Sequence, residues 1–313
     1  MTKISEPIVF FGSGPVAAKS LELLLQKFDV EAVITKPRPP HHRGPVPVLD
    51  LASAKKLPVF TAQNKSELDS LLASERFTSR LAILIDFGII VSQGVIDCFP
   101  LGIINSHFSL LPEWRGADPI TFSILSGQKK TGVSLMLLSV GMDEGPLLAQ
   151  VQTEISSTMT TPELTDELVQ LSFAALSHII PLYVTGEVTT APQEAVTLAT
   201  SKVPSYSRRL SKKDGVIDWQ KPAIEIEREI RAFSGWPQSK ASFDRLDVIL
   251  TKAHILPLHG KPGMRTLIDK MPVVYCGVDA LAIDNIKPAG KKEMTGQAFL
   301  AGYKAIFTAS TKT

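Results

Sequence analysis

Short apolar runs alternate with amphipathic segments over the first part of the chain. Four runs have the length and composition of strands, at residues 8–11, 31–35, 58–60 and 81–85. Three intervening segments are typical of helices, at residues 16–24, 46–56 and 66–74. Strands and helices that alternate in this way predict right-handed crossovers and a parallel, Rossmann-like sheet, hence an α/β fold.

A second group of elements follows residue 100. Apolar runs at residues 101–104, 133–140 and 147–155 predict further strands. A helix with a purely packing face should open at Thr161, where the threonine can cap it and Pro162 fits the first turn. The chain then turns polar. We therefore expect an N-terminal domain over residues 1–190, a linker over 191–205 and a C-terminal domain over 206–313.

The last hundred residues carry a different pattern. A helix is expected from Ala223, with Ile226, Ile230 and Phe233 on one face. Short strands follow at close spacing, around residues 240–243, 248–255, 266–268, 273–276 and 281–286. So many short strands predict a small β-barrel, and oligonucleotide-binding (OB) barrels are one common form.

Composition is that of a soluble globular protein. Of 313 residues, 44% are hydrophobic and 20% are charged, which is ordinary for a chain with room for two domains. No apolar run reaches the length of a membrane span and the N-terminus lacks the apolar core of a signal peptide, so we expect a cytoplasmic protein without a membrane partner. Cys98 and Cys276 lack metal-ligand spacing, which predicts reduced thiols and no metal site.

The net charge of +2 conceals an asymmetry along the chain. Residues 1–203 carry a net charge of −5, and residues 204–313 carry a net charge of +7. A basic C-terminal third suggests contact with a polyanion such as RNA. Surface lysines that serve only solubility produce the same count, so charge alone leaves both interpretations open.

The clearest candidate chemistry follows the apolar run at residues 101–104. Asn105 and His107 lie two residues apart at the expected end of a strand, so their side chains should point to the same side. Asp143 follows in a glycine-flanked turn. An amide and an imidazole suit acyl transfer, which needs donors for an oxyanion and a proton for the departing nitrogen, and a carboxylate can orient the imidazole. A lone histidine at a strand end is more often structural.

The neighbouring residues resemble the folate-dependent formyltransferases. Their signature is Asn-x-His-x-Ser-Leu-Leu-Pro, followed by Arg-Gly-Ala and later by Gly-x-Asp-x-Gly, and all of it is present here. In that family the asparagine, histidine and aspartate form the catalytic triad. The resemblance therefore implies that Asn105, His107 and Asp143 are catalytic.

The same resemblance implies a folate site. The formyl donor would be 10-formyltetrahydrofolate, lined by the residues of the signature that follow the histidine, Ser109, Leu110, Leu111 and Pro112. Two nearby residues, Phe108 and Asp118, depart from the smaller neutral residues expected there.

The C-terminal half is similar to the methionyl-tRNA formyltransferases. The shared patterns are Leu-Ser-Lys-x-x-x-x-Ile-Asp-Trp at residues 210–219 and Ile-Arg-Ala-Phe-x-x-Trp-Pro at residues 230–237. Together with the first half, the similarity covers nearly the whole chain. It implies an enzyme that formylates the free amino group of methionine on charged initiator tRNA, and we expect this enzyme to be a monomer.

Two basic elements are implied to contact tRNA. The proline-rich loop at residues 36–45 carries Arg38 and Arg43, and prolines exclude helix and central strand there. The equivalent loop of the family clasps the acceptor end of tRNA and is a few residues longer. Late in the chain, Lys291 and Lys292 form a second basic site.

Other functions share parts of this pattern. Glycinamide ribonucleotide formyltransferases match the triad but lack such a second domain. Sugar-nucleotide N-formyltransferases have a similar second domain, although we expect them to differ from this chain at Phe233, Trp236 and Pro237. A non-catalytic RNA-binding protein on a relic formyltransferase fold is an alternative of another class, and the intact triad argues against it.

Overall fold

A computed structural model describes residues 4–41, 43–200 and 202–308. Its contacts divide the chain into two compact units. The N-terminal unit holds most of the chain up to Ser207. The C-terminal unit holds the chain from Arg208, together with two excursions, Ile120–Lys129 and Ile155–Leu164.

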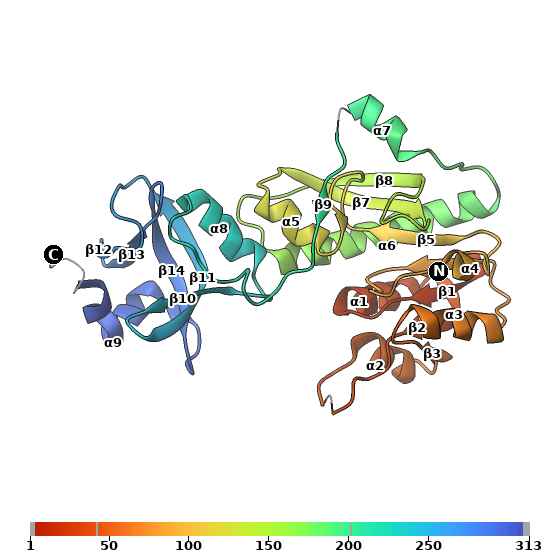
Figure 1. Ribbon diagram of the computed structural model, residues 1–313, viewed down its shortest axis with the longest axis horizontal. Coiled ribbons are helices and arrows are strands. Elements are labelled where there is room, and N and C mark those ends of the chain that lie inside the picture. The colour runs from red at the N-terminus through yellow and green to blue at the C-terminus, as the bar shows by residue number, and fades with distance from the viewer. Residues whose placement is uncertain (1–3, 42, 201, 309–313) are drawn as a thin grey trace. The chain divides into compact units, whose positions relative to one another are not determined.

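A seven-stranded sheet forms the centre of the N-terminal unit (Figure 1), in the order β3-β2-β1-β4-β5-β7-β8. The first five of these strands run parallel, as predicted. The last two are antiparallel to their neighbours and extend the sheet beyond β5. The strands are β1 (Ile4–Phe11), β2 (Phe28–Thr35), β3 (Val59–Thr61), β4 (Leu81–Leu84), β5 (Ile103–His107), β7 (Lys130–Leu137) and β8 (Leu147–Glu154).

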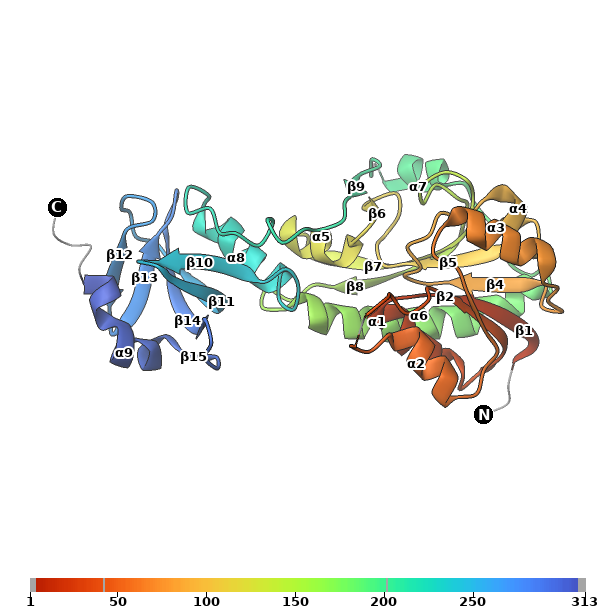
Figure 2. The ribbon, with the colours of Figure 1, turned by 60° about the horizontal axis from the view of Figure 1, so that its bottom comes forward.

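Helices cover both faces of this sheet. Figure 2 shows α1 (Pro15–Leu24), α2 (Pro47–Ala54) and α6 (Thr161–Val184) on one face, and α3 (Lys65–Ser74) and α4 (Gln93–Ile96) on the other. The chain changes face because it steps from β1 towards β3 and then returns across β1 to β4. Ligands bind at such a switch point, beyond the carboxyl ends of the parallel strands. In this sheet, β1, β4 and β5 present that edge side by side.

The long helix α6 is a core element. By length and composition alone it is the one helix in the described part of the chain that is apolar enough to cross a membrane. Its Leu168, Leu176 and Ile180 are fully buried, and the Ser172 hydroxyl lies 2.7 Å from the hydroxyl of Ser106 on β5. The predicted helix start at Thr161 is confirmed, as is its role as a packing face.

The C-terminal unit is built on an antiparallel sheet in the order β10-β11-β14-β13-β12, with β15 paired to β14. Its strands are β10 (Ser239–Phe243), β11 (Leu246–Leu256), β12 (Arg265–Ile268), β13 (Met271–Tyr275), β14 (Ala280–Pro288) and β15 (Met294–Thr295). The predicted helix α8 (Ala223–Ala232) packs against β11 and places Ile226 and Ile230 in the core. A second helix, α9 (Gly296–Thr308), was not expected, and it contributes Phe299 and Phe307 to the same core.

The segment expected to be a linker is ordered secondary structure in part. It contains the helix α7 (Gln193–Thr200), which follows Pro192, and proline is well suited to the start of a helix. The two-residue strand β9 (Tyr206–Ser207) pairs in parallel with β6 (Arg115–Gly116). Both elements belong to the N-terminal unit. The short helix α5 (Pro119–Leu125) completes the set.

Candidate active site

Strand β5 carries the first two candidate residues at its carboxyl end. It is the central member of the β4-β5-β7 group, with Asn105 opposite Leu84 of β4 and opposite Met136 of β7. The strand alternates as predicted, because Ser106 points to α6 whereas Asn105 and His107 meet Asp143 on the other face. Asn105 and His107 are 7% and 6% exposed, so each is open to solvent over only a small part of its surface.

The carboxylate of Asp143 joins these residues. The Asn105 side-chain amide donates to Asp143 Oδ1 at 3.1 Å, and the Gly116 backbone N–H donates to Asp143 Oδ2 at 2.8 Å. His107 Nδ1 lies 3.7 Å from Asp143 Oδ2. The structure therefore brings the three residues predicted as a triad into one small volume.

The imidazole of His107 has an oxygen neighbour on each side. Its Nε2 lies 2.9 Å from the backbone oxygen of Trp114, while Nδ1 faces Asp143. A carbonyl oxygen can only accept, so Nε2 carries a proton in this contact. Nδ1 is then the ring nitrogen that does not donate to Trp114, and it lies 3.7 Å from Asp143 Oδ2, beyond hydrogen-bonding distance. The site is thus arranged to accept and release a proton at Nδ1, beside the carboxylate.

The turn that presents Asp143 depends on close backbone contacts. Asp143 has a positive φ of 51°, which aspartate tolerates better than most residues. A Cβ on Gly145 would lie 1.8 Å from the Leu137 carbonyl oxygen, so only glycine lets the turn come this close to β7. Gly116, whose N–H holds the carboxylate, has a φ of 99°. Glycine permits that conformation without strain.

A buried network fixes this turn, and sequence patterns did not reveal it. Gln193, at the start of α7, donates from Nε2 to the backbone oxygens of Asp143 at 2.8 Å and Gly145 at 2.9 Å. The Arg115 guanidinium donates to Gln193 Oε1 at 2.8 Å and to Glu144 Oε1 at 3.0 Å. Arg115 belongs to the Arg-Gly-Ala part of the signature, but Gln193 carried no signal because it lies in a polar stretch without a motif.

The four residues predicted to line a folate site form a buried segment, here called the folate wall. Ser109 and Leu111 have no exposed surface, and the Ser109 hydroxyl donates to the backbone oxygen of Glu113. The buried Ser134 hydroxyl donates to the Ser109 carbonyl at 2.7 Å and accepts from the Leu111 N–H at 2.9 Å. Gln150 donates to the Leu111 carbonyl at 2.7 Å. Leu110 and Pro112 are also buried, so the structure places all four as a braced segment directly after β5.

An acidic side chain stands at the same sheet edge. Asp86 follows β4, and its carbonyl accepts from Ser13 N at 3.0 Å in the loop after β1. A Cβ on Gly14 would lie 1.9 Å from Asp86 Oδ2, so the carboxylate rests directly against the Gly14 backbone. The residue is exposed at its surface, yet desolvation by the chain packed around the carboxyl group, together with the charge of Asp118, raises its pKa from 3.8 to about 6. Lys36 opposes this shift.

The basic loop after β2 has neither helix nor strand in the residues described, which agrees with its prolines. Arg38 donates to the Gly44 carbonyl of the loop and to the Asp50 carboxylate of α2, each at 2.7 Å. Arg43 is exposed. The two arginines therefore differ: Arg38 shapes the loop, while Arg43 presents its charge to solvent.

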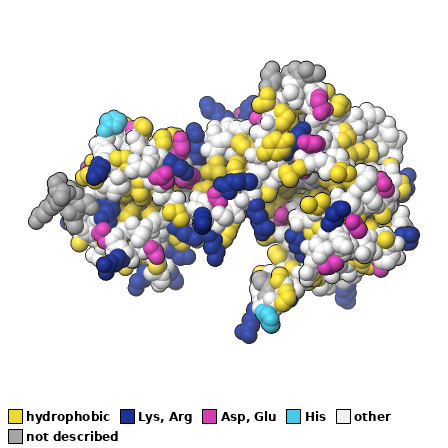
Figure 3. All heavy atoms as spheres, in the orientation of Figure 1, with side chains coloured by type: hydrophobic (Ala, Val, Ile, Leu, Met, Phe, Trp, Pro, Cys, Tyr) yellow, Lys and Arg dark blue, Asp and Glu magenta, His cyan; other side chains and the backbone are white. Residues whose placement is uncertain are grey.

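The C-terminal unit carries the other predicted basic residues. Lys291 and Lys292 are exposed in the turn between β14 and β15. Figure 3 shows further Lys and Arg side chains spread over the visible face of this unit.

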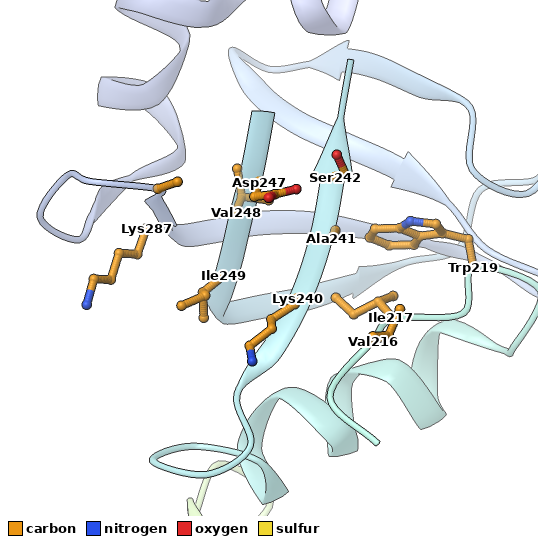
Figure 4. A pocket seen from close by; sticks show the side chains of 11 residues that line it. Val216, Ile217, Trp219, Lys240, Ala241, Ser242, Asp247, Val248, Ile249 and Lys287 are labelled. Carbon is orange, nitrogen blue, oxygen red and sulfur yellow. The ribbon is translucent and has the colours of Figure 1, made fainter. Parts of the chain in front are cut away.

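A cavity of about 620 Å³ lies beside β10 and β11 (Figure 4). Trp219 forms one apolar wall. Lys240, Ile249 and Lys287 are paired across three neighbouring strands, so two ammonium groups flank one apolar side chain. Ser242 and Asp247, also paired across strands, add polar groups.

Among the described residues there is no cluster of three or more His, Cys, Asp or Glu side chains arranged to hold a metal ion. Cys98 and Cys276 are free thiols, the first exposed and the second buried. The groups that the site offers for chemistry are the amide, imidazole and carboxylate described above.

Comparisons with known proteins agree with this architecture. The Formyl transferase profile matches residues 8–180, and the Formyl transferase, C-terminal domain profile matches residues 209–304. The methionyl-tRNA formyltransferase of Chloroflexus aurantiacus is 34% identical over 307 residues, which covers 95% of this chain and 97% of that protein. The methionyl-tRNA formyltransferase of Pseudomonas putida is 35% identical over 294 residues, with coverage of 92% and 93%.

Solved structures share the fold at lower identity. The N-formyltransferase from Helicobacter canadensis, solved with folinic acid and dTDP-3-aminofucose, has a TM-score of 0.66 at 20% identity and covers 89% of this chain and 99% of its own. HypX from Aquifex aeolicus, in complex with tetrahydrofolic acid, has a TM-score of 0.62 at 14% identity, with coverage of 96% and 48%. The two matching profiles and the relatives above 30% identity over more than nine-tenths of the chain establish its place: it belongs to the methionyl-tRNA formyltransferase family.

Proposed function

We propose that this protein transfers the formyl group of 10-formyltetrahydrofolate to the free amino group of methionine on charged initiator tRNA. The observation that carries the proposal is the convergence of Asn105, His107 and Asp143 at the carboxyl edge of the sheet. Relatives named for this reaction cover nearly the whole chain, and neighbours solved with folate compounds support a folate-type donor.

In the reaction the methionyl amine attacks the formyl carbon, and a tetrahedral oxyanion develops on the formyl oxygen. The Asn105 amide has two N–H donors and gives one to Asp143, which leaves the second for the oxyanion. The new C–N bond releases a proton from the amine, and the C–N10 bond breaks as N10 of the folate takes up a proton. His107 is placed to move that proton, with Asp143 holding the imidazole and its positive charge.

The folate wall has a positioning role in this scheme. Its four residues are buried: Ser109, Leu110, Leu111 and Pro112. We therefore propose that they set the shape of the donor site and do not contact the folate through exposed side chains. Ser134 and Gln150 brace the segment from β7 and β8. A rigid wall keeps the formyl carbon near the triad, and a small misplacement costs much of the rate.

The basic elements would bind the tRNA. Arg43 on the loop after β2 is exposed, and the C-terminal unit offers Lys291, Lys292 and the pair Lys240 and Lys287 beside the Trp219 cavity. The ammonium groups of the C-terminal unit neutralise phosphates, which gives affinity without sequence discrimination. Arg43, on the loop of the N-terminal unit, would instead contribute to the selection of the initiator tRNA. A charged-tRNA substrate supports our expectation of a cytoplasmic enzyme. The two family profiles leave residues 181–208 between them, which supports a domain boundary in this part of the chain, although the contacts place the division after Ser207, beyond the expected linker at residues 191–205.

A direct assay tests the proposal. Purified protein is incubated with 10-formyltetrahydrofolate and methionyl initiator tRNA, and formyl-methionine released by mild hydrolysis is measured by mass spectrometry. Uncharged tRNA and Asp143→Ala protein serve as controls. A dTDP-linked amino sugar is offered in parallel, because formylation of the sugar and not of the tRNA would overturn the assignment of acceptor. Tight tRNA binding without any formyl transfer would instead support the alternative of a non-catalytic RNA-binding protein.

A further inference from the structure

The last segment of the N-terminal unit, which leads to the C-terminal unit, is hydrogen-bonded to the loops that form the site. At its start, Ala191 and Leu147 exchange backbone hydrogen bonds of 2.8 and 2.7 Å, just beyond the Asp143 turn. At its end, β9 pairs with β6, so that Arg115 lies opposite Tyr206 and Gly116 lies opposite Ser207. Residues 191–200 and 202–207, here called the connecting segment, therefore touch both loops that hold the candidate triad.

Within the connecting segment, Gln193 is a buried residue whose side chain hydrogen-bonds to the Asp143 turn. It is 2% exposed, and its two amide protons are given to the carbonyl oxygens of Asp143 and Gly145. Its amide oxygen accepts from Nη2 of Arg115 at 2.8 Å and from Nε at 3.3 Å. Only an amide meets all of these partners, because the carbonyls need donors and the guanidinium needs an acceptor.

The other end of the connecting segment holds the opposite side of the triad. The Ser205 carbonyl accepts from Arg115 N at 2.9 Å, and the Ser205 hydroxyl accepts from Trp114 N at 2.9 Å. Trp114 in turn supplies the carbonyl that meets His107 Nε2, and Gly116 supplies the N–H that meets Asp143 Oδ2. The residues that supply these backbone partners of His107 and Asp143 are thus themselves bonded to, or paired with, the connecting segment.

We propose that Gln193 is a positioning residue for formyl transfer, and that the connecting segment sets the geometry of the triad as well as joining the two units. This inference rests on the proposed function of Asn105, His107 and Asp143. Gln193 touches no reacting atom. It acts by holding the Asp143 turn, whose central residue has a positive φ and whose carboxylate must stay within reach of His107.

The test compares Gln193→Ala and Gln193→Glu with the wild-type protein in the formylation assay. Either change removes both donors to the Asp143 turn, and Glu also places a carboxylate against two carbonyls. We expect kcat to fall on the order of 10- to 100-fold, the scale of a small displacement of catalytic groups, with KM for folate and tRNA within about twofold. Gln93→Ala is the matched control, because Gln93 also begins a short helix, but its side chain is exposed and donates to the Asp97 carboxylate.

A double-mutant cycle separates positioning from general loosening of the fold. If Gln193 acts through Asp143, then Gln193→Ala should cost almost nothing in protein that already carries Asp143→Ala. An equal loss of kcat in both backgrounds, or a Gln193→Ala enzyme with wild-type kcat, would overturn the inference. Neither outcome touches the proposed function, whose own failure would appear as a wild-type protein without formyl transfer.

Discussion

Replacing Asp143 by asparagine tests the triad most severely, because the change keeps the shape and removes the charge. Both carboxylate oxygens accept hydrogen bonds, one from Asn105 and one from Gly116. The new amide therefore turns a donor towards one of these donors in either orientation. A mispaired buried group costs about 1–3 kcal/mol, which corresponds to roughly 5- to 160-fold in rate if the transition state feels all of it.

The loss of the negative charge adds to this effect. An amide in place of the carboxylate cannot stabilise the positive charge of His107 from its Nδ1 side, and proton transfer by a placed side chain is worth about 10²- to 10⁴-fold. We therefore expect kcat of Asp143→Asn to fall by about 10²-fold or more, with Asp143→Ala at least as low. Asn105→Ala and His107→Ala should each lose about 10²-fold or more, and double variants should lose less than the product.

The assay is steady-state formylation of methionyl initiator tRNA at saturating folate, with circular dichroism and thermal unfolding to confirm the fold. Asp166→Asn is a suitable control, because Asp166 is an exposed carboxylate on α6 that pairs with Lys19. A folded Asp143→Asn protein that keeps kcat within about threefold of wild type, less than the smallest loss worked out above, would refute a catalytic role for the carboxylate.

Three further outcomes follow from the structure. Asp86 has a raised pKa of about 6, so it binds a proton more readily in the folded than in the unfolded chain. The free energy of unfolding should therefore fall as pH rises from about 4 to about 6. Asp86→Asn should remove that slope when thermal unfolding is measured against pH. Ser134→Ala leaves the Leu111 N–H without its acceptor and should raise KM for folate more than KM for tRNA, whereas equal changes would contradict a role in the folate wall. Arg43→Ala should lower kcat/KM for initiator tRNA well beyond any loss of tRNA binding. Replacing Lys291 and Lys292 should instead weaken binding of initiator and elongator tRNA alike and reduce the salt dependence of binding. Equal effects of Arg43→Ala on both tRNAs would contradict selection by the loop.

The sequence predicted the centre of the N-terminal sheet because β4 and β5 are buried on both faces and therefore read as apolar runs. The strand at residues 81–85 is β4, and the run before Asn105 is β5. Periodicity also placed Asn105 and His107 on one side, since alternation along a strand follows from backbone geometry alone. The direction of β7 and β8 was not predicted, because local pattern does not encode whether a neighbouring strand is parallel or antiparallel.

The elements that sequence reasoning missed are those whose partners are backbone groups. Residues 193–200 were read as part of a polar linker, yet α7 forms there and Gln193 is buried. A glutamine that donates to two carbonyl oxygens leaves no pattern, because any residue can supply a carbonyl. Helix α9 was missed for a different reason: it follows the strands of the C-terminal unit closely, and its Phe299 and Phe307 are eight residues apart in a stretch that also contains glycine.

The arrangement of donors around Asp143 explains why this site needs a second element to hold it. The carboxylate is met by an amide and a backbone N–H, which are neutral, and by an imidazole 3.7 Å away, so among the described residues no fixed cation anchors it in place. A guanidinium close to the Asp143 carboxylate would hold that carboxylate firmly, but it would compete with His107 for the negative charge of Asp143. Arg115 is instead turned to Glu144 and Gln193, and it reaches the turn only through them. The fold thereby fixes the position of Asp143 with neutral hydrogen bonds and leaves its charge to the imidazole.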